Sequence, residues 1–178
     1  MNAPPAIETA RLLLSRPESR HAEPIFERYA SDPAVTRFLG WPRHQSIADT
    51  RTFLAFSATQ WEQWPAGPYL IWSREGGALL GGTGFGFETA DEALTGYVLA
   101  RDAWGKGYAT EALTAIVGLA PAIGVRRLSA LCHAEHRVSQ RVLEKCGFAP
   151  VRTSSLEIVF PNLEPATPQA ACRYEIHF

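Results

Sequence analysis

The segment DAWGKGYATEAL, at residues 102–113, combines two glycines, a lysine and the start of a helix-forming run. A helix that begins near Tyr108 leaves unpaired backbone N–H groups at its positive end, and such an end binds anions. Gly105 and Gly107 let a ligand approach the main chain, and they permit the positive φ angles that turn successive N–H groups inward. The segment therefore predicts a phosphate-binding loop that fits a diphosphate.

Two common phosphate-binding motifs do not match this segment. A Walker P-loop needs Ser or Thr directly after the lysine, but Lys106 is followed by Gly107. A dinucleotide-binding fingerprint needs a third glycine, where this chain has Thr110, and a later acidic residue, where the region around Arg127 is basic. Coenzyme A is the third candidate.

The spacing of apolar residues predicts the elements that position the loop. Strands are expected at residues 11–16, 69–73, 78–87, 93–100, 126–132, 151–160 and 172–178, and helices at 19–30, 46–64, 108–122 and 136–148. Ser46 and Asp49 form a capping-box pattern, and Gly147 stands where a left-handed residue ends a helix. The order β-α-α-β-β-β-α-β-α-β-β predicts an α+β fold with a mixed, mostly antiparallel sheet of about six or seven strands flanked by helices.

Length and charge limit the function. The 178 residues are expected to form a single domain, 1–178. A net charge of -1 excludes a global field that would draw the protein to nucleic acid or to a membrane surface, so neither partner is expected. Three cysteines without CxxC spacing indicate free thiols in a reducing compartment. With no signal-peptide pattern and no apolar run long enough to cross a bilayer, a soluble, cytoplasmic protein is expected.

Two segments, GYVLARDAWGKGYATEAL and HRVSQRVLEKCGF, together resemble the GNAT superfamily of acetyl-CoA-dependent N-acetyltransferases. The branch that acetylates the N-terminal alanine or serine of ribosomal proteins is the most similar. ETARLLLSRP and SDPAVTRFLGWP also follow the family's order, so the resemblance covers roughly residues 7 to 150. It implies a GNAT-like fold, acetyl-CoA as cosubstrate without a metal, and a monomer or homodimer that acetylates an amine of a protein N-terminus or a small molecule.

The resemblance also implies roles for individual residues. Backbone N–H groups from Trp104 to Ala109 would hold the diphosphate, and the N–H of Leu99 would polarise the thioester carbonyl. In the family's Asn-x-x-Ser pattern, His136 replaces the asparagine, and Ser139 would contact the cofactor and protonate the departing thiolate. The expected cofactor contacts are Val98, Leu99, Trp104, Gly105, Lys106, Gly107, Tyr108, Ala109, Thr110, His136, Ser139 and Arg141.

A general base is less clearly indicated. Glu157 lies in the region where relatives of this branch carry a glutamate that faces the acceptor, and Glu88 and Glu92 are alternatives. Leu143 stands where many relatives have a proton-donating tyrosine, which leaves Ser139 as the candidate acid. An α-amine with a pKa of about 8 is partly neutral at cell pH, whereas a lysine amine, at about 10.4, is not. A site without a strong base therefore favours an α-amine as acceptor.

Other interpretations remain open at this point. The group Cys132, His133, Glu135 and His136 looks like a metal site, but it runs from a strand end into a helix and has no second ligand pair, so no metal is expected. Two alternative functions are a coenzyme A-binding module without turnover, which would share the phosphate loop, and an acyl carrier that uses Cys132 and His133. Four aromatic residues could pack the core or line an acceptor pocket: Trp41, Trp61, Trp64 and Tyr69.

Overall fold

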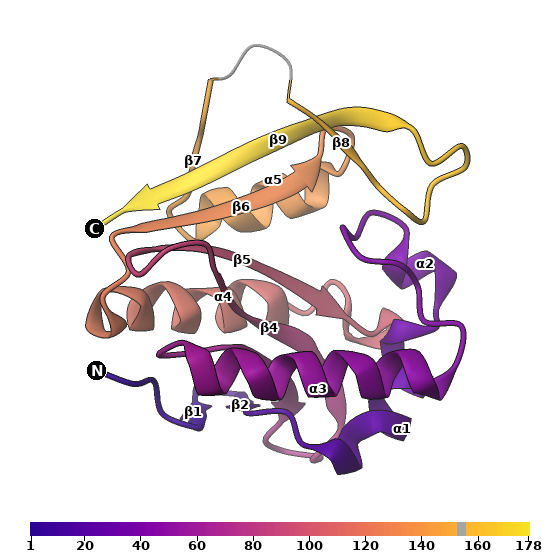
Figure 1. The fold of residues 1–178 in the computed structure, drawn as a ribbon, viewed down its shortest axis with the longest axis vertical. Helices are drawn as coiled ribbons and strands as arrows, with labels where there is room; N and C mark the ends of the chain where they lie inside the picture. The colour runs from indigo at the N-terminus through magenta and orange to yellow at the C-terminus, as the bar shows by residue number, and fades with distance from the viewer. Residues whose placement is uncertain (153–155) are drawn as a thin grey trace.

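The computed structural model describes residues 1–152 and 156–178, which form one sheet with helices on both faces (Figure 1). The strands are β1 (Ala6–Glu8), β2 (Leu12–Ser15), β3 (Pro68–Ser73), β4 (Leu79–Phe87), β5 (Glu92–Leu99), β6 (Arg127–His133), β7 (Ala149–Pro150), β8 (Glu157–Val159) and β9 (Pro168–His177). The helices are α1 (Ala22–Ile25), α2 (Pro33–Thr36), α3 (Ile47–Gln63), α4 (Tyr108–Leu119) and α5 (Arg137–Lys145). Short 3₁₀ or π turns lie at Ser19–His21, Phe26–Ala30, Arg101–Ala103 and Ala120–Ile123.

The sheet is mixed and mostly antiparallel, as the sequence predicts. Its order is β1-β2-β3-β4-β5-β6-β9-β7, with β8 also paired to β9, and among the strands of residues 1–152 and 156–178 only β5 and β6 pair in parallel. The α4 crossover joins these two strands. The expected count of six or seven strands was too low, because β1 and β8 are three-residue strands without a clear period of their own.

The strand expected at 151–160 is longer than the strand found in the described part of that range, which is β8 at Glu157–Val159. β7 lies before the range and pairs with β9 near Glu175, whereas β8 pairs with β9 near Gln169. Residues 153–155 lie outside the described part of the chain.

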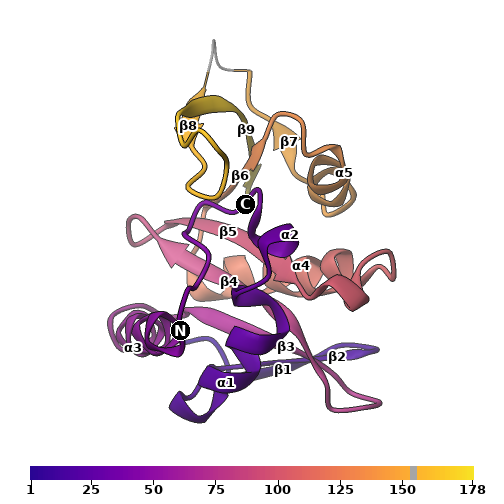
Figure 2. The same ribbon diagram turned by 90° about the vertical axis from the view of Figure 1, so that its right-hand side faces the viewer.

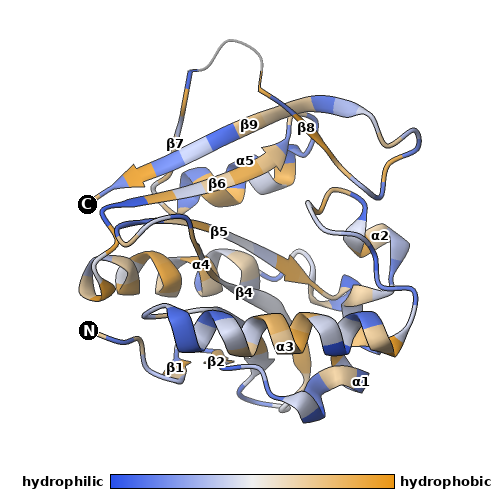
Figure 3. Cartoon of the chain, viewed as in Figure 1, coloured by the Kyte–Doolittle hydropathy of each residue, from blue (hydrophilic) through white to orange (hydrophobic). Residues whose placement is uncertain are grey.

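Apolar side chains pack on both faces of the sheet. α4 buries Leu113 and Ile116 on one face, while Ile25 from α1 and Leu54 from α3 pack on the other. Figure 2 shows α3 and α4 on opposite sides of β4, and Figure 3 shows apolar segments along α4 and β6. No helix in the described ranges is both long and apolar enough to cross a membrane.

Local signals set several element ends as predicted. Ser46 and Asp49 form a capping box at the start of α3, and Gly147 has a φ of +90° just after α5. The helix expected at 19–30 is instead a 3₁₀ turn, one turn of α-helix and a π turn. The loop before α4 follows directly after the end of β5.

Candidate active site

The parallel strands β5 and β6 separate after a short paired stretch. Pairing covers only Glu92–Leu94 with Arg127–Ser129, although β5 continues to Leu99 and β6 to His133. Figure 1 shows the arrowheads of the two strands diverging. Beyond Leu94 the two strands therefore splay apart.

The register of β5 directs the backbone of Leu99 into this splay. Ala100 N–H donates to the carbonyl of Leu80 on β4 at 2.8 Å. In an antiparallel pair, alternate residues bond to the same partner strand, so the N–H and C=O of Leu99 point the other way, toward β6. The Leu99 carbonyl accepts a hydrogen bond from the indole Nε1 of Trp104 at 2.9 Å, and within the described residues β6 does not pair with Leu99. Its N–H is thus directed as an oxyanion donor must be.

The phosphate loop has the predicted backbone conformation. Gly105 and Gly107 have φ values of +73° and +79°, and Gly107 is the N-cap of α4. Glu111 N–H makes the first helical bond, to the Gly107 carbonyl at 3.1 Å. The N–H groups of the three residues before Glu111 therefore form the free, positive end of a twelve-residue helix.

The predicted cofactor contacts lie on three parts of the fold. The loop and first turn of α4 hold Trp104, Gly105, Lys106, Gly107, Tyr108, Ala109 and Thr110; the end of β5 holds Val98 and Leu99; and the start of α5 holds His136, Ser139 and Arg141. Cys146, just after α5, donates from its thiol to the Thr110 carbonyl at 3.5 Å, which ties the end of α5 to the start of α4.

Tyr97 is a candidate site residue that the sequence interpretation missed. It lies on β5 two residues before Leu99, with Ser139 near its hydroxyl. Burial raises the pKa of Tyr97, and Ser139 lowers it by less. The hydroxyl thus stays protonated. The two-residue period of the strand places Tyr97 and Leu99 on the same face, and this pattern could have identified Tyr97 from the sequence.

The opposite face of β5 is bare at Gly96. Gly96 shares this face with Val98, which packs against the cluster of α1 and α3. It is exposed in the middle of a central strand, a Cβ there would meet nothing within 4 Å, and its φ is outside the left-handed region. Neither packing nor backbone conformation requires a glycine, so the position is open to a ligand.

The candidate bases do not converge on the splay. Glu157 is exposed on β8 opposite Ala170, two strands away from β6. Glu92 is paired with Arg127, and Glu88 is exposed in the turn between β4 and β5. The role of Glu157 stays a prediction.

The metal-like group forms an aromatic cluster instead. The His133 ring lies 4.8 Å from that of Phe38, and its Nδ1 accepts from the Glu135 N–H at 3.1 Å. Burial and the neighbouring His133 lower the pKa of His136. In the described ranges no three His, Cys, Asp or Glu side chains gather as metal ligands.

Cys132 is a poor acyl carrier in this environment. Its side chain is buried, and burial raises the pKa of its thiol to about 12. The thiolate is the nucleophilic form of cysteine, so this group is inert near neutral pH.

The four aromatic residues do not form one pocket. Trp61 packs edge-on against the buried Tyr69 near the end of α3, and Trp64 stacks on Phe87. Trp41 lies near the start of α3, against His44. Core packing is therefore the better interpretation of Trp61 and Tyr69.

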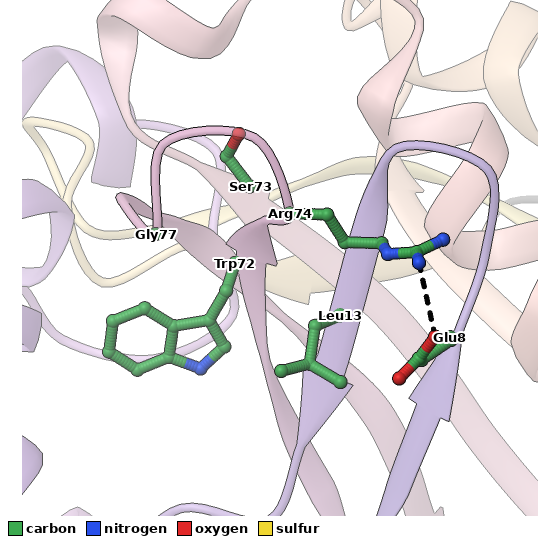
Figure 4. A pocket seen from close by; sticks show the side chains of 6 residues that line it. All are labelled: Glu8, Leu13, Trp72, Ser73, Arg74 and Gly77. Carbon is green, nitrogen blue, oxygen red and sulfur yellow. Dashed lines mark ion pairs between the residues drawn. The ribbon is translucent and has the colours of Figure 1, made fainter.

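A surface hollow lies away from the splay (Figure 4). It is lined by Glu8, Leu13, Trp72, Ser73, Arg74 and Gly77, and Arg74 pairs with Glu8 at 3.2 Å. It contains none of the predicted site residues. We interpret it as a gap between the β1–β2 turn and the β3–β4 turn.

Comparison with known proteins tests the resemblance to the GNAT superfamily. The model of the acetyltransferase (GNAT) domain matches residues 11–149. The uncharacterized N-acetyltransferase YoaA of Bacillus subtilis is 29% identical over 147 residues, which cover 81% of this chain and 82% of YoaA.

Solved structures share the fold at low identity. The microcin C7 self-immunity acetyltransferase MccE, in complex with acetyl-CoA and AMP, has a TM-score of 0.84 and 19% identity over 99% of this chain and 98% of its own. RimL, a ribosomal L7/L12 α-N-protein acetyltransferase in complex with coenzyme A, has a TM-score of 0.83 and 19% identity over 97% and 98%.

Proposed function

Because this chain belongs to the GNAT acetyltransferase family, we propose that its single domain transfers the acetyl group of acetyl-CoA to the α-amine of a peptide N-terminus. One observation carries the proposal: the free end of α4, with its left-handed glycines, adjoins the open edge of β5. The first feature suits a diphosphate and the second suits the thioester at the other end of the same molecule.

Each residue group has a part in the transfer. The loop from Trp104 to Ala109 binds the diphosphate, which places the thioester carbonyl at the N–H of Leu99. The amine nitrogen bonds to the carbonyl carbon, the C–S bond breaks and the amine loses a proton to solvent. Ser139, with the protonated Tyr97 behind it, supplies a proton to the departing thiolate. His136 would take the place of the usual asparagine beside the pantetheine arm.

The acceptor approaches from the other face of the sheet. Gly96 leaves that face of β5 uncovered next to Leu99, and the phosphate loop lies beyond the end of the same strand. The acceptor residues that follow the reacting amine then pass over the exposed backbone of β5 at Gly96. RimL is an α-N-protein acetyltransferase, which supports a peptide acceptor here, whereas MccE represents a different acetyltransferase on the same fold.

The absence of a converging carboxylate in the described residues supports an α-amine. Such an amine, with a pKa of about 8, needs less help to lose its proton than a lysine at about 10.4. Two alternatives remain as proposals: a small-molecule amine as acceptor, and a coenzyme A-binding module without turnover.

Thiol release tests the proposal. Acetyl-CoA is incubated with the protein and with amines of graded size, from serine amide to short peptides with free or blocked N-termini, and free thiol is followed by a colorimetric reagent. We expect release with free N-termini and none with blocked ones. Binding of coenzyme A without release would identify the binding module, and release with serine amide alone would identify the small-molecule enzyme.

A further inference from the structure

We propose that Arg11 and Glu111 form a bracket that holds the phosphate loop in its anion-binding conformation, with Arg11 as the positioning residue. The inference rests on the proposed function, because it assigns a role toward the diphosphate of acetyl-CoA. Both residues lie outside the predicted site, and 100 positions separate them in the sequence.

Glu111 anchors the turn between β1 and β2 on the first turn of α4. Its Oε1 accepts from the Thr9 hydroxyl at 2.6 Å and from the Arg11 N–H at 2.8 Å. Its Oε2 accepts from Arg11 Nε at 2.7 Å. Although partial burial raises the pKa of Glu111, these hydrogen bonds lower it below its ordinary value, so the carboxylate stays charged. The Glu111 carboxylate and its three donors thus form a network, unlike an isolated surface ion pair.

Arg11 extends the bracket to the loop itself. Its Nη1 donates to the carbonyl of Lys106 at 2.9 Å, and its guanidinium lies 4.6 Å from the centre of the Tyr108 ring. One planar group therefore contacts the loop, the helix start and Glu111 together. The fixed fork of an arginine is suited to such a role, whereas a lysine has a single ammonium.

The contact with Lys106 fixes the direction of an anion-binding N–H. A trans peptide unit is planar, and its C=O and N–H point in opposite directions. Because Arg11 holds the Lys106 carbonyl, the N–H of Gly107 must point away from Arg11. Gly107 N–H makes no hydrogen bond with any residue that the structure describes. Two left-handed glycines make this loop flexible, so a restraint on the peptide between them reduces the entropy lost when an anion binds.

The bracket also removes an electrostatic conflict. Glu111 lies in the first turn of α4, where its charge would repel a diphosphate, and Arg11 compensates it at 2.7 Å. Arg11 can thus act through its positive charge near the ligand or through its hold on the loop. Arg11→Lys keeps the charge but loses the planar fork, so it separates these two effects.

The test compares two donors, acetyl-CoA and S-acetyl-pantetheine, of which only the first has a diphosphate. For each protein we measure kcat/KM with both donors and take their ratio. The wild type is expected to prefer acetyl-CoA strongly. Equal kcat/KM values for the wild type would contradict the proposed function itself, because the loop would then not recognise the diphosphate.

The variants are Arg11→Ala, Arg11→Lys and Glu111→Gln. We expect each to lower the ratio about tenfold, since one charge-assisted hydrogen bond to the loop is lost or misdirected. Arg51→Ala is the control, because it removes an ion pair to Glu23, between α3 and α1, which pack on the face of the sheet opposite α4. It should leave the ratio unchanged.

Three results would overturn the bracket. An unchanged ratio in Arg11→Lys would mean that charge alone matters. A higher affinity for acetyl-CoA in Glu111→Gln would mean that the carboxylate only repels the ligand. An equal loss with both donors would indicate general destabilisation. If Arg11→Ala does not fold, the two conservative variants still decide.

Discussion

Replacement of Gly105 by alanine tests the phosphate loop most directly. A Cβ at Gly105 would meet nothing within 4 Å, so its cost in the free protein comes only from the φ of +73°. Alanine in the left-handed region costs about 1–2 kcal/mol. Alanine also makes the unfolded chain less flexible than glycine does, and this offsets about 0.4–1 kcal/mol of the cost. A net loss of about 1 kcal/mol corresponds to a Tm lowered by about 2–4 °C for a domain of this size.

The effect on coenzyme A should be larger than the effect on stability. If Gly105→Ala keeps the positive φ, the added methyl enters the space around the loop that a ligand needs. If φ relaxes to a negative value, the N–H groups of the loop turn away from the diphosphate. Loss of one hydrogen bond to a charged group costs about 1.5–3 kcal/mol, which predicts roughly 10- to 100-fold weaker binding.

Gly77→Ala is the matched control. Gly77 has a φ of +63°, a Cβ there would also meet nothing within 4 Å, and it lies in the turn between β3 and β4. Both variants should lose similar stability in urea denaturation, but only Gly105→Ala should weaken coenzyme A in calorimetric titration. Equal affinity in the two variants would refute the assignment of the loop.

Four further substitutions test the other parts of the site. Gly81→Ala places a Cβ 1.9 Å from a carbonyl oxygen of β5, so the strand must move; we expect a loss of about 1–3 kcal/mol in denaturation and a lower kcat, and a wild-type kcat would contradict the oxyanion role of β5. Tyr97→Phe removes a hydroxyl near the candidate acid Ser139, and should lower kcat with little change in KM for acetyl-CoA; an unaltered kcat would show that the acid acts alone. Gly96→Ala should raise KM for the acceptor without loss of stability, while Gly118→Ala, in open space on α4, should leave KM unchanged; equal KM values would remove Gly96 from the acceptor path. Because burial lowers the pKa of His136, the folded state binds fewer protons than the unfolded state, so stability is full above about pH 6.5 and falls at lower pH. His136→Asn should flatten this dependence in denaturation curves at pH 5 to 8, and an unchanged slope would assign it to other groups.

The features set by local sequence were predictable. The left-handed Gly105 and Gly107, the capping box of Ser46 and the end of α5 at Gly147 depend on a few neighbouring residues, and the structure confirms them. The order of elements also predicted a mixed, mostly antiparallel sheet, and in the structure β5 and β6, which are joined through α4, pair in parallel.

The features set by distant contacts were not predictable. Arg11 reads as the first residue of a strand, and nothing near it indicates a bond to Glu111 or to Lys106. The strand expected at 151–160 failed for a related reason. Its apolar alternation indicates strand propensity, but the partner β9 decides which residues pair, and within the described part of that range the paired strand is Glu157–Val159.

The open junction between β5 and β6 connects fold and function. A sheet that separates after three residue pairs leaves backbone N–H and C=O groups facing the gap, and such groups need partners. Trp104 satisfies one of them, the Leu99 carbonyl, with an indole from the phosphate loop itself. The adjacent N–H of Leu99 points the same way. A ligand that lies along this edge therefore meets a donor already held in place by the same tryptophan that begins the loop. In the proposed function, the short connection from Leu99 to Trp104 would thus position both the diphosphate end and the reactive end of one ligand.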